Sequence, residues 1–231
     1  MEECVLNTPP RNDESDFFDT LAEQLYSAVI SDVLDKLGSP NQAMRTNIRP
    51  AFHGARMVGR AHTMRSADIY EVPPEGHPYG FMTEALDSVP VNGIVIGATQ
   101  ASTRTVLWGE LLSTVSRVRG GRGAIVDGDI RDISMIEEMD FPVFCSGFRP
   151  QDSLGRGKII SYGEPVDCGG VIVHPGDIIF ADADGVVCIP QAVEAEAIRL
   201  AQEKVFGENE MRTWLASGRS LKETFDHFQI L

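Results

Sequence analysis

Residues 93–148 read GIVIGATQASTRTVLWGELLSTVSRVRGGRGAIVDGDIRDISMIEEMDFPVFCSGF and decide the fold. Three short apolar runs in this segment have the length and the flanking glycines or prolines of buried strands: 93–98, 123–128 and 142–148. Helical patterns lie between them, at about 106–119 and at 129–139. Strand, helix, strand, helix and strand at this spacing predict a parallel βαβαβ unit with right-handed crossovers.

The pattern changes on both sides of this unit. Toward the N-terminus, apolar residues at helical spacing predict one helix over 17–37, and residues 48–72 predict strands joined by tight turns. Toward the C-terminus, residues 158–190 are β-rich and broken by Gly-Gly, Pro-Gly-Asp and Asp-Gly turns. Helices are predicted over 191–206 and 209–228. The chain is therefore predicted to be an α/β protein with a β-rich C-terminal half.

Length and composition favour one domain with terminal decorations. The chain has 231 residues, of which 42% are hydrophobic, enough to bury a sizeable core. We expect residues 1–15, rich in Pro, Asn, Asp and Glu, to be a flexible N-terminal tail. Residues 16–206 are expected to form the domain, and residues 207–231 a C-terminal helical extension.

The charge balance excludes several classes of protein. The 34 acidic side chains outnumber the 20 basic ones and give a net charge of −14, which is opposite to a nucleic-acid footprint. No run of 18 apolar residues could span a membrane, and the polar, acidic N-terminus does not resemble a signal peptide. We therefore expect a cytoplasmic protein. The four cysteines show no CxxC spacing, which argues against a zinc site or a disulfide framework.

Ligands of α/β sheets gather beyond the carboxyl ends of the parallel strands, where two loops of this chain should meet in one crevice. The first loop leads from 99–105 into the helix that carries LWGELL (107–112). Free backbone amides around Trp108 and Leu111 could bind a carboxylate or a phosphate, and Gly109 would let the ligand approach closely. The alternative is an ordinary helix start with Trp108 packed in the core.

The second loop, DGDIRD (127–132), places four charged side chains at a strand end. Arg131 could pair with the carboxylate or oxo oxygen of a 2-oxo acid, and Asp132 could hold a hard divalent cation through oxygen. The alternative is a salt-bridged helix start in which Asp132 caps the helix and Arg131 is solvated. No GxSxG, P-loop, HExxH or GxGxxG motif offers another site, and the acids of 175–187 fit turns of a β-meander.

Larger pieces of the sequence carry a family resemblance: WGELLSTVSRVRGGRGAIVDGDIRD (108–132), FPVFCSG (141–147), VHPGDIIFADADGVVCIP (173–190) and SDVLDKLG (31–38). In combination they resemble the family that joins the class II pyruvate aldolases to the regulator of ribonuclease activity A. Its aldolases act on 4-hydroxy-4-methyl-2-oxoglutarate and 4-carboxy-4-hydroxy-2-oxoadipate. The resemblance covers most of the chain and implies a swivelling β/β/α fold, assembled as a homotrimer or homohexamer with active sites at subunit interfaces.

The resemblance also implies the site. Arg131 would grip pyruvate, Asp132 would bind Mg²⁺ or Mn²⁺, and backbone amides would bind the pyruvyl carboxylate. The substrate-binding residues expected on this basis are Gly109, Glu110, Leu111, Leu112 and Arg131. The regulator branch lacks the Asp, so Asp132 favours an enzyme.

The expected activity is metal-dependent cleavage of a 4-hydroxy-2-oxo acid or diacid to pyruvate, with oxaloacetate decarboxylation as a side activity. The 2-oxo acid would be the partner of the site, with Arg131 stabilising the enolate charge and Glu110 relaying a proton. No lysine lies near either loop to form a Schiff base, and the nearest is Lys158. The alternative is a non-enzymatic regulator that binds a ribonuclease or another protein. A methyltransferase is disfavoured because no glycine-rich loop follows a first strand.

Two positions depart from the family pattern or leave it open. A Gly-Asp or Gly-Asn pair often precedes the helix in the family, and we align it with Ala101-Ser102, which would remove a supporting carboxylate. A second acid comes from the C-terminal region of a neighbouring subunit in the family, and Glu208 or Glu210 could provide it.

Overall fold

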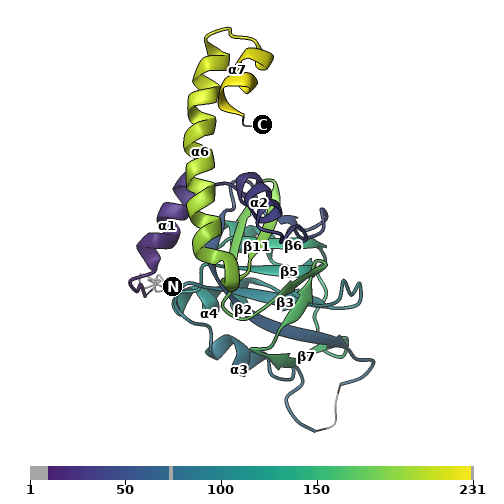
Figure 1. Cartoon of the computed structure of the whole chain (residues 1–231). Helices are drawn as coiled ribbons and strands as arrows, with labels where there is room; N and C mark the ends of the chain where they lie inside the picture. Colours follow the sequence, from purple (N-terminus) through teal and green to yellow (C-terminus); the bar gives the residue numbers. More distant parts are fainter. Residues whose placement is uncertain (1–9, 73–74, 230–231) are drawn as a thin grey trace.

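The computed structural model describes residues 10–72 and 75–229, which form a mixed α/β fold around one large sheet (Figure 1). The strands of the sheet follow the order β1-β6-β5-β3-β2-β10-β11, with β4 paired to β5 and β7 paired to β2. They are β1 (Arg49–Pro50), β2 (Met57–Asp68), β3 (Gly93–Ala98), β4 (Val106–Trp108), β5 (Gly123–Ile130), β6 (Val143–Phe148), β7 (Gly157–Tyr162), β10 (Ile178–Asp182) and β11 (Gly185–Ile189). A separate hairpin consists of β8 (Val166–Cys168) and β9 (Val171–Val173).

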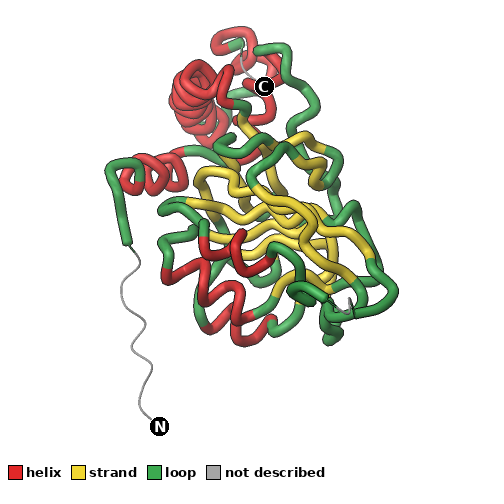
Figure 2. The backbone as a smooth tube through the Cα atoms, turned by 90° about the horizontal axis from the view of Figure 1, so that it is seen from below, coloured by secondary structure: helices red, strands yellow, loops and turns green. Residues whose placement is uncertain are grey.

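The helices lie on both sides of these strands, which gather in the middle of the molecule (Figure 2). They are α1 (Ser15–Gln24), α2 (Ser27–Lys36), α3 (Met82–Asp87), α4 (Glu110–Val118), α5 (Ile133–Glu138), the 3₁₀ turn η1 (Gln191–Val193), α6 (Glu194–Ala216) and α7 (Leu221–Phe228). Across the described residues, no helix is both long enough and apolar enough to cross a membrane.

The predicted parallel βαβαβ unit is confirmed as β3-α4-β5-α5-β6, and the α/β fold class is confirmed with it. β3 pairs with β5 and β5 pairs with β6, in both cases in parallel. Both faces of β3 are buried, which explains its uninterrupted apolar sequence. Ile94 and Ile96 pack with the β8-β9 hairpin, whereas Val95 packs with residues of α3, α4 and α5.

The predicted helix over 17–37 is wrong, because the chain forms two helices with a break at Leu25 and Tyr26. Both break residues have extended backbone. The cause lies far away in the sequence: the carboxylate of Asp182 accepts bonds from the Ser27 amide at 2.8 Å and from the Ser27 hydroxyl at 2.6 Å. This carboxylate caps the start of α2 and so fixes where the second helix begins.

The predicted start of the central helix near residue 106 is also wrong. Val106–Trp108 forms β4, which pairs in parallel with the end of β5, and α4 begins only at Glu110. All three β4 residues are buried, and the Trp108 carbonyl accepts a bond from the Arg131 amide at 3.0 Å. The later helix start matters for the site, because it makes Gly109-Glu110 the pair at which the helix begins.

The two predicted C-terminal helices have different bounds in the structure. α6 runs without interruption from Glu194 to Ala216, so the predicted boundary at 206/207 falls inside one helix. Its outer half and α7 stand away from the sheet as a helical hairpin (Figure 1). The Trp214 ring stacks on His227 with centroids 4.4 Å apart and holds the hairpin together. A subunit-interface role for 207–231 stays a prediction.

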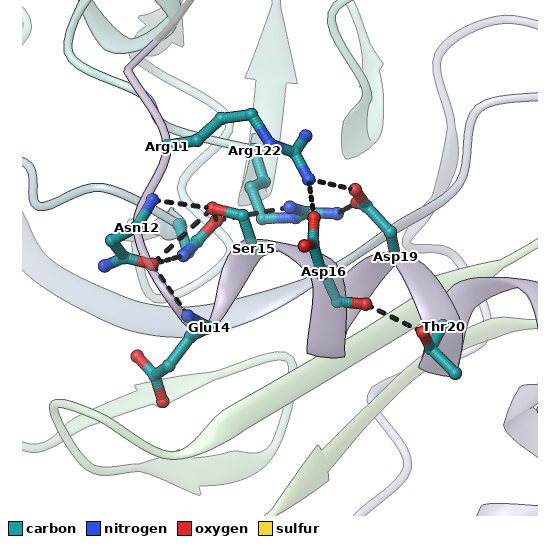
Figure 3. Close-up of polar contacts among 9 residues, drawn as sticks. Arg11, Asn12, Glu14, Ser15, Asp16, Asp19, Thr20 and Arg122 are labelled. Carbon is teal, nitrogen blue, oxygen red and sulfur yellow. Dashed lines mark hydrogen bonds and ion pairs between the residues drawn. The ribbon is translucent and has the colours of Figure 1, made fainter.

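The predicted flexible tail, residues 1–15, divides at residue 10. Residues 1–9 lie outside the described residues. Residues 10–15 contact the rest of the fold, and their flexibility stays a prediction. The Arg11 guanidinium lies 2.7 Å from the carboxylate of Asp19, which also pairs with Arg122 (Figure 3). The Ser15 hydroxyl donates to the side-chain oxygen of Asn92 at 3.0 Å.

Candidate active site

The carboxyl ends of β4 and β5 bring the two predicted loops together. β4 leads into Gly109 and α4, and β5 leads into Arg131, Asp132 and α5. These loops line one cavity of about 400 Å³. Of the predicted site residues, Gly109, Leu111, Leu112, Arg131 and Asp132 line it. The structure therefore confirms that the two loops form a single crevice.

Asp132 has an unusual backbone that turns its carboxylate toward α4. Its φ of 62° and ψ of 37° lie in the left-handed region, which Asp tolerates better than most residues. Its side chain does not cap α5. The carboxylate instead accepts a bond from the Glu110 amide at 3.2 Å and lies 3.4 Å from Nε of Arg131. Asp132 is thus the N-cap residue of α5 by position, as the helix-capping interpretation expects, but its side chain bonds to the start of α4 instead of capping α5.

Gly109 is required by this arrangement because it leaves room for the Asp132 carboxylate. A Cβ atom at position 109 would lie 2.6 Å from Oδ2 of Asp132 and 3.2 Å from Cγ of Arg131. The buried Trp108 precedes it and donates from its indole nitrogen to Ser113 at 2.8 Å. Trp108 therefore packs in the core, as the alternative interpretation expects, whereas ligand binding at Gly109 stays a prediction.

Arg131 lies between two carboxylates. Besides Asp132, the Asp152 carboxylate lies 3.6 Å from its Nη1 atom, which also donates to the carbonyl of Gln151 at 3.3 Å. Asp152 accepts a bond from the Tyr79 hydroxyl at 3.0 Å, and this bond raises the pKa of Tyr79. Sequence reasoning missed Asp152 and Tyr79. Asp152 follows β6, so the strand-end rule that singled out Arg131 could have found it.

Glu110 is the one predicted site residue that does not line the cavity. Its side chain points along α4. Its Oε1 atom accepts a bond from the Thr114 hydroxyl at 2.7 Å. The Glu110 amide already donates to the Asp132 carboxylate. Of the amides predicted to bind a ligand, those of Leu111 and Leu112 in the first turn of α4 are left. The amides of Leu111 and Leu112 have no intrahelical partner, since the first N–H groups of a helix lack one.

The other acids of DGDIRD have structural roles. The Asp127 side chain is 1% exposed and accepts bonds from the Thr99 amide at 2.5 Å and from the Thr99 hydroxyl at 2.7 Å. Asp129 pairs with Arg149 at 3.2 Å. Both therefore stabilise the loops behind the cavity and are absent from its lining.

Ala101-Ser102 does not lie directly before α4, where the family resemblance would place the Gly-Asp or Gly-Asn pair. The Ser102 hydroxyl donates to Asp68 at 2.6 Å, and neither residue lines the cavity. Because α4 begins at Glu110, the Gly-acid pair at the helix start is Gly109-Glu110. The expected loss of a supporting carboxylate was therefore a misalignment.

A divalent cation fits the donor set, although no cluster of three or more potential ligands exists among the described residues. Mg²⁺ typically uses one or two protein carboxylates and keeps several waters. Asp132 supplies one carboxylate on an open cavity, with a side chain that is 36% exposed. Gly109 keeps the space above that carboxylate free of a Cβ atom. The site therefore suits a hydrated Mg²⁺ or Mn²⁺ better than a fully protein-ligated ion.

The C-terminal acids and the three cysteines of the described residues lie outside this cavity. Glu208 accepts a bond from Arg212 of its own chain at 2.7 Å, whereas Glu210 is exposed. Completion of a neighbouring site by either acid stays a prediction. Cys145 is buried, and desolvation raises the pKa of its thiol to about 12, which does not suit a nucleophile.

Comparison with known proteins gives the family. The model of the RraA-like family, described as Aldolase/RraA, matches residues 27–188. The chain belongs to this family, which confirms the resemblance seen in the sequence.

Individual relatives differ in their names and lengths. A Halalkalibacterium halodurans protein provisionally named 4-hydroxy-4-methyl-2-oxoglutarate aldolase is 32% identical over 83% of this chain and 84% of its own length. Protein DlpA of Legionella pneumophila is 32% identical over 96% of this chain, which spans only 36% of DlpA. The structure of RraAS2 from Streptomyces coelicolor, an unusual member of the RNase ES inhibitor RraA family, superposes with a TM-score of 0.75. It is 25% identical, over 88% of this chain and 99% of that one.

Proposed function

We propose that this protein is a divalent-metal-dependent aldolase that cleaves a 4-hydroxy-2-oxo acid to pyruvate and decarboxylates oxaloacetate as a side reaction. The observation that carries the proposal is the left-handed Asp132, whose carboxylate turns into a cavity beside Arg131 and beneath the first turn of α4. Strained backbone at such a position is typical of functional sites. The relationship to a provisionally named aldolase supports the same activity.

The residues of the chain divide the work. The amides of Leu111 and Leu112, at the positive end of the α4 dipole, would bind the substrate carboxylate. Asp132 would hold the Mg²⁺ or Mn²⁺ ion, which supplies Lewis-acid polarisation of the 2-oxo group when bound. Arg131, held in place by Asp152, would stabilise the negative charge that develops on the pyruvate oxygen as the C3–C4 bond breaks.

Glu110 is the residue we propose for proton transfer at the 4-hydroxyl group. Its carboxylate rests on Thr114 and would have to rotate toward the cavity to act. Since apo geometry often shows catalytic groups out of position, this resting contact is compatible with the role.

The proposal is tested by measuring pyruvate release from oxaloacetate and from 4-hydroxy-4-methyl-2-oxoglutarate, with Mg²⁺ and with EDTA. Asp132→Ala should abolish release. Asp140→Ala is a matched control, because Asp140 is also left-handed, with φ of 51°, and follows α5 where Asp132 precedes it. The control should retain activity, and equal release by wild type and Asp132→Ala would overturn the proposal.

A second candidate is a regulator that binds a ribonuclease, favoured by the likeness to the RNase ES inhibitor family member. In that case neither substrate would release pyruvate above the Asp132→Ala background. The acidic surface, with a net charge of −14, would then contribute to binding the partner protein.

A further inference from the structure

The cavity has two chemically different parts. Arg131, Asp132 and Asp152 lie among its lining residues, whereas α3, α4 and β4 contribute a largely apolar wall. That wall consists of Met82, Leu86, Leu107, Leu111, Leu112 and Val115. Met82, Leu86 and Leu107 are nearly inaccessible, with exposed fractions of 8%, 4% and 2%. Leu111, in contrast, is 70% exposed. The wall therefore combines a fixed surface of the core with one exposed leucine.

We propose that the substrate carries an apolar aliphatic or aromatic substituent on C4 and no second carboxylate. This inference rests on the proposed aldolase function and names its substrate class. With the C1 carboxylate on the amides of Leu111 and Leu112 and the 2-oxo group at Arg131 and Asp132, the C4 substituent would lie against the apolar wall. The volume of about 400 Å³ leaves room beyond pyruvate for such a group.

The charges of the cavity point the same way. Among the described residues that line it, Arg131 is the one permanent cation, and Asp87, Asp132 and Asp152 are acids. Arg131 already faces two of these carboxylates, at 3.4 and 3.6 Å. Asp87 is paired with Arg119, which does not line the cavity. A diacid would therefore place its second carboxylate against apolar side chains, where no cation among the lining residues is free to pair with it. Burying an unpaired charge is strongly unfavourable, so the site selects against a C4 substituent that keeps its carboxylate through the reaction. The second carboxylate of oxaloacetate is instead lost as CO₂.

The reaction balances without another reactant. The 4-hydroxyl group loses its proton and becomes the carbonyl of the leaving aldehyde or ketone as the C3–C4 bond breaks. The electron pair of that bond forms the pyruvate enolate, which takes a proton at C3. The products are pyruvate and an apolar carbonyl compound.

The test compares kcat/KM for 4-hydroxy-2-oxohexanoate and 4-hydroxy-2-oxo-4-phenylbutanoate with that for the diacid 4-hydroxy-4-methyl-2-oxoglutarate. The two monoacids should be favoured by about 10- to 100-fold, as expected from burying an apolar group of this size. A diacid turned over as well as either monoacid overturns this inference and leaves the aldolase function standing. Release from none of the three and none from oxaloacetate overturns both.

A charge variant tests the specificity at a residue outside the catalytic machinery. Thr83 is exposed on α3 and lines the cavity, so Thr83→Lys adds a cation beside the apolar wall. It should raise kcat/KM for the diacid and reduce the preference for monoacids. Thr20→Lys makes the same change at an exposed position of α1 outside the cavity and should leave the preference unchanged. An equal effect of both variants would contradict the assignment of the wall.

Discussion

Replacing Gly109 with alanine should remove most of the activity and leave the fold intact. The backbone of Gly109 is extended, with φ of −164°, so alanine adopts it without strain. The new Cβ atom would lie 2.6 Å from Oδ2 of Asp132, which must retreat by about 0.8 Å to reach the 3.4 Å of an ordinary contact. A misplacement of about 1 Å costs on the order of 100-fold in rate, so we expect kcat/KM to fall by about 30- to 100-fold.

The cost in stability should be small, because the atoms that move belong to the ends of partly exposed side chains. We expect a loss of about 1 kcal/mol or less in the free energy of unfolding. Pyruvate release coupled to lactate dehydrogenase measures the first quantity, and urea denaturation measures the second.

Gly147→Ala is the matched control for this prediction. Its Cβ atom would lie 2.8 Å from a carboxylate oxygen of Asp129, a similar clash with an acid outside the cavity. Activity of this variant should stay within about twofold of wild type. Full activity of Gly109→Ala would refute the assigned position of Asp132, and an equal loss in both variants would show that general destabilisation is responsible.

Three further predictions concern the site, the helix break and the response to pH. Arg131→Lys removes the planar guanidinium group that pairs with Asp152 and should reduce kcat by about 10²- to 10³-fold. The circular dichroism spectrum should stay the same, and retained turnover would contradict the proposed role of Arg131. Ser27→Ala removes one bond to Asp182 at the start of α2 and should lower the free energy of unfolding in urea by about 1 kcal/mol, whereas an unchanged midpoint would show that the amide bond suffices. Desolvation lowers the pKa of His62 in the folded protein, so the imidazole binds a proton more readily in the unfolded state. The free energy of unfolding should therefore fall as the pH drops below about 6.5 toward the folded-state pKa. His62→Gln should lose less stability than wild type between pH 7.5 and pH 5 in urea denaturation, and identical losses would contradict this.

Local sequence was sufficient for the parallel unit and for the prediction that two loops line one cavity. The apolar runs of β3 and β5 identify buried strands, and the strand-end rule brings Gly109 and Arg131 together before any coordinates are known. The residues at which α2 and α4 begin could not be predicted from the local sequence. The first depends on Asp182, which is distant in the sequence, and the second on the pairing of three residues of β4 with β5.

The detailed chemistry of the site also depends on contacts that no local pattern contains. The direction of the Asp132 carboxylate follows from a left-handed backbone, which Asp adopts in only a minority of cases. The contact between Tyr79 and Asp152 joins residues that are far apart in the chain. The misalignment at Ala101-Ser102 arose because the start of α4 could not be placed from periodicity alone.

Hydrogen–deuterium exchange at the methyl group of pyruvate, followed by proton NMR in D₂O, tests most directly whether this cavity generates a pyruvate enolate at Arg131 and Asp132. The exchange needs no knowledge of the second product, so it separates the enolate chemistry from the choice of substrate. We predict exchange that requires Mg²⁺ or Mn²⁺, stops with EDTA, is lost in Asp132→Ala and persists in Asp140→Ala. Exchange by wild type no faster than by Asp132→Ala, with the metal present, would contradict the central claim.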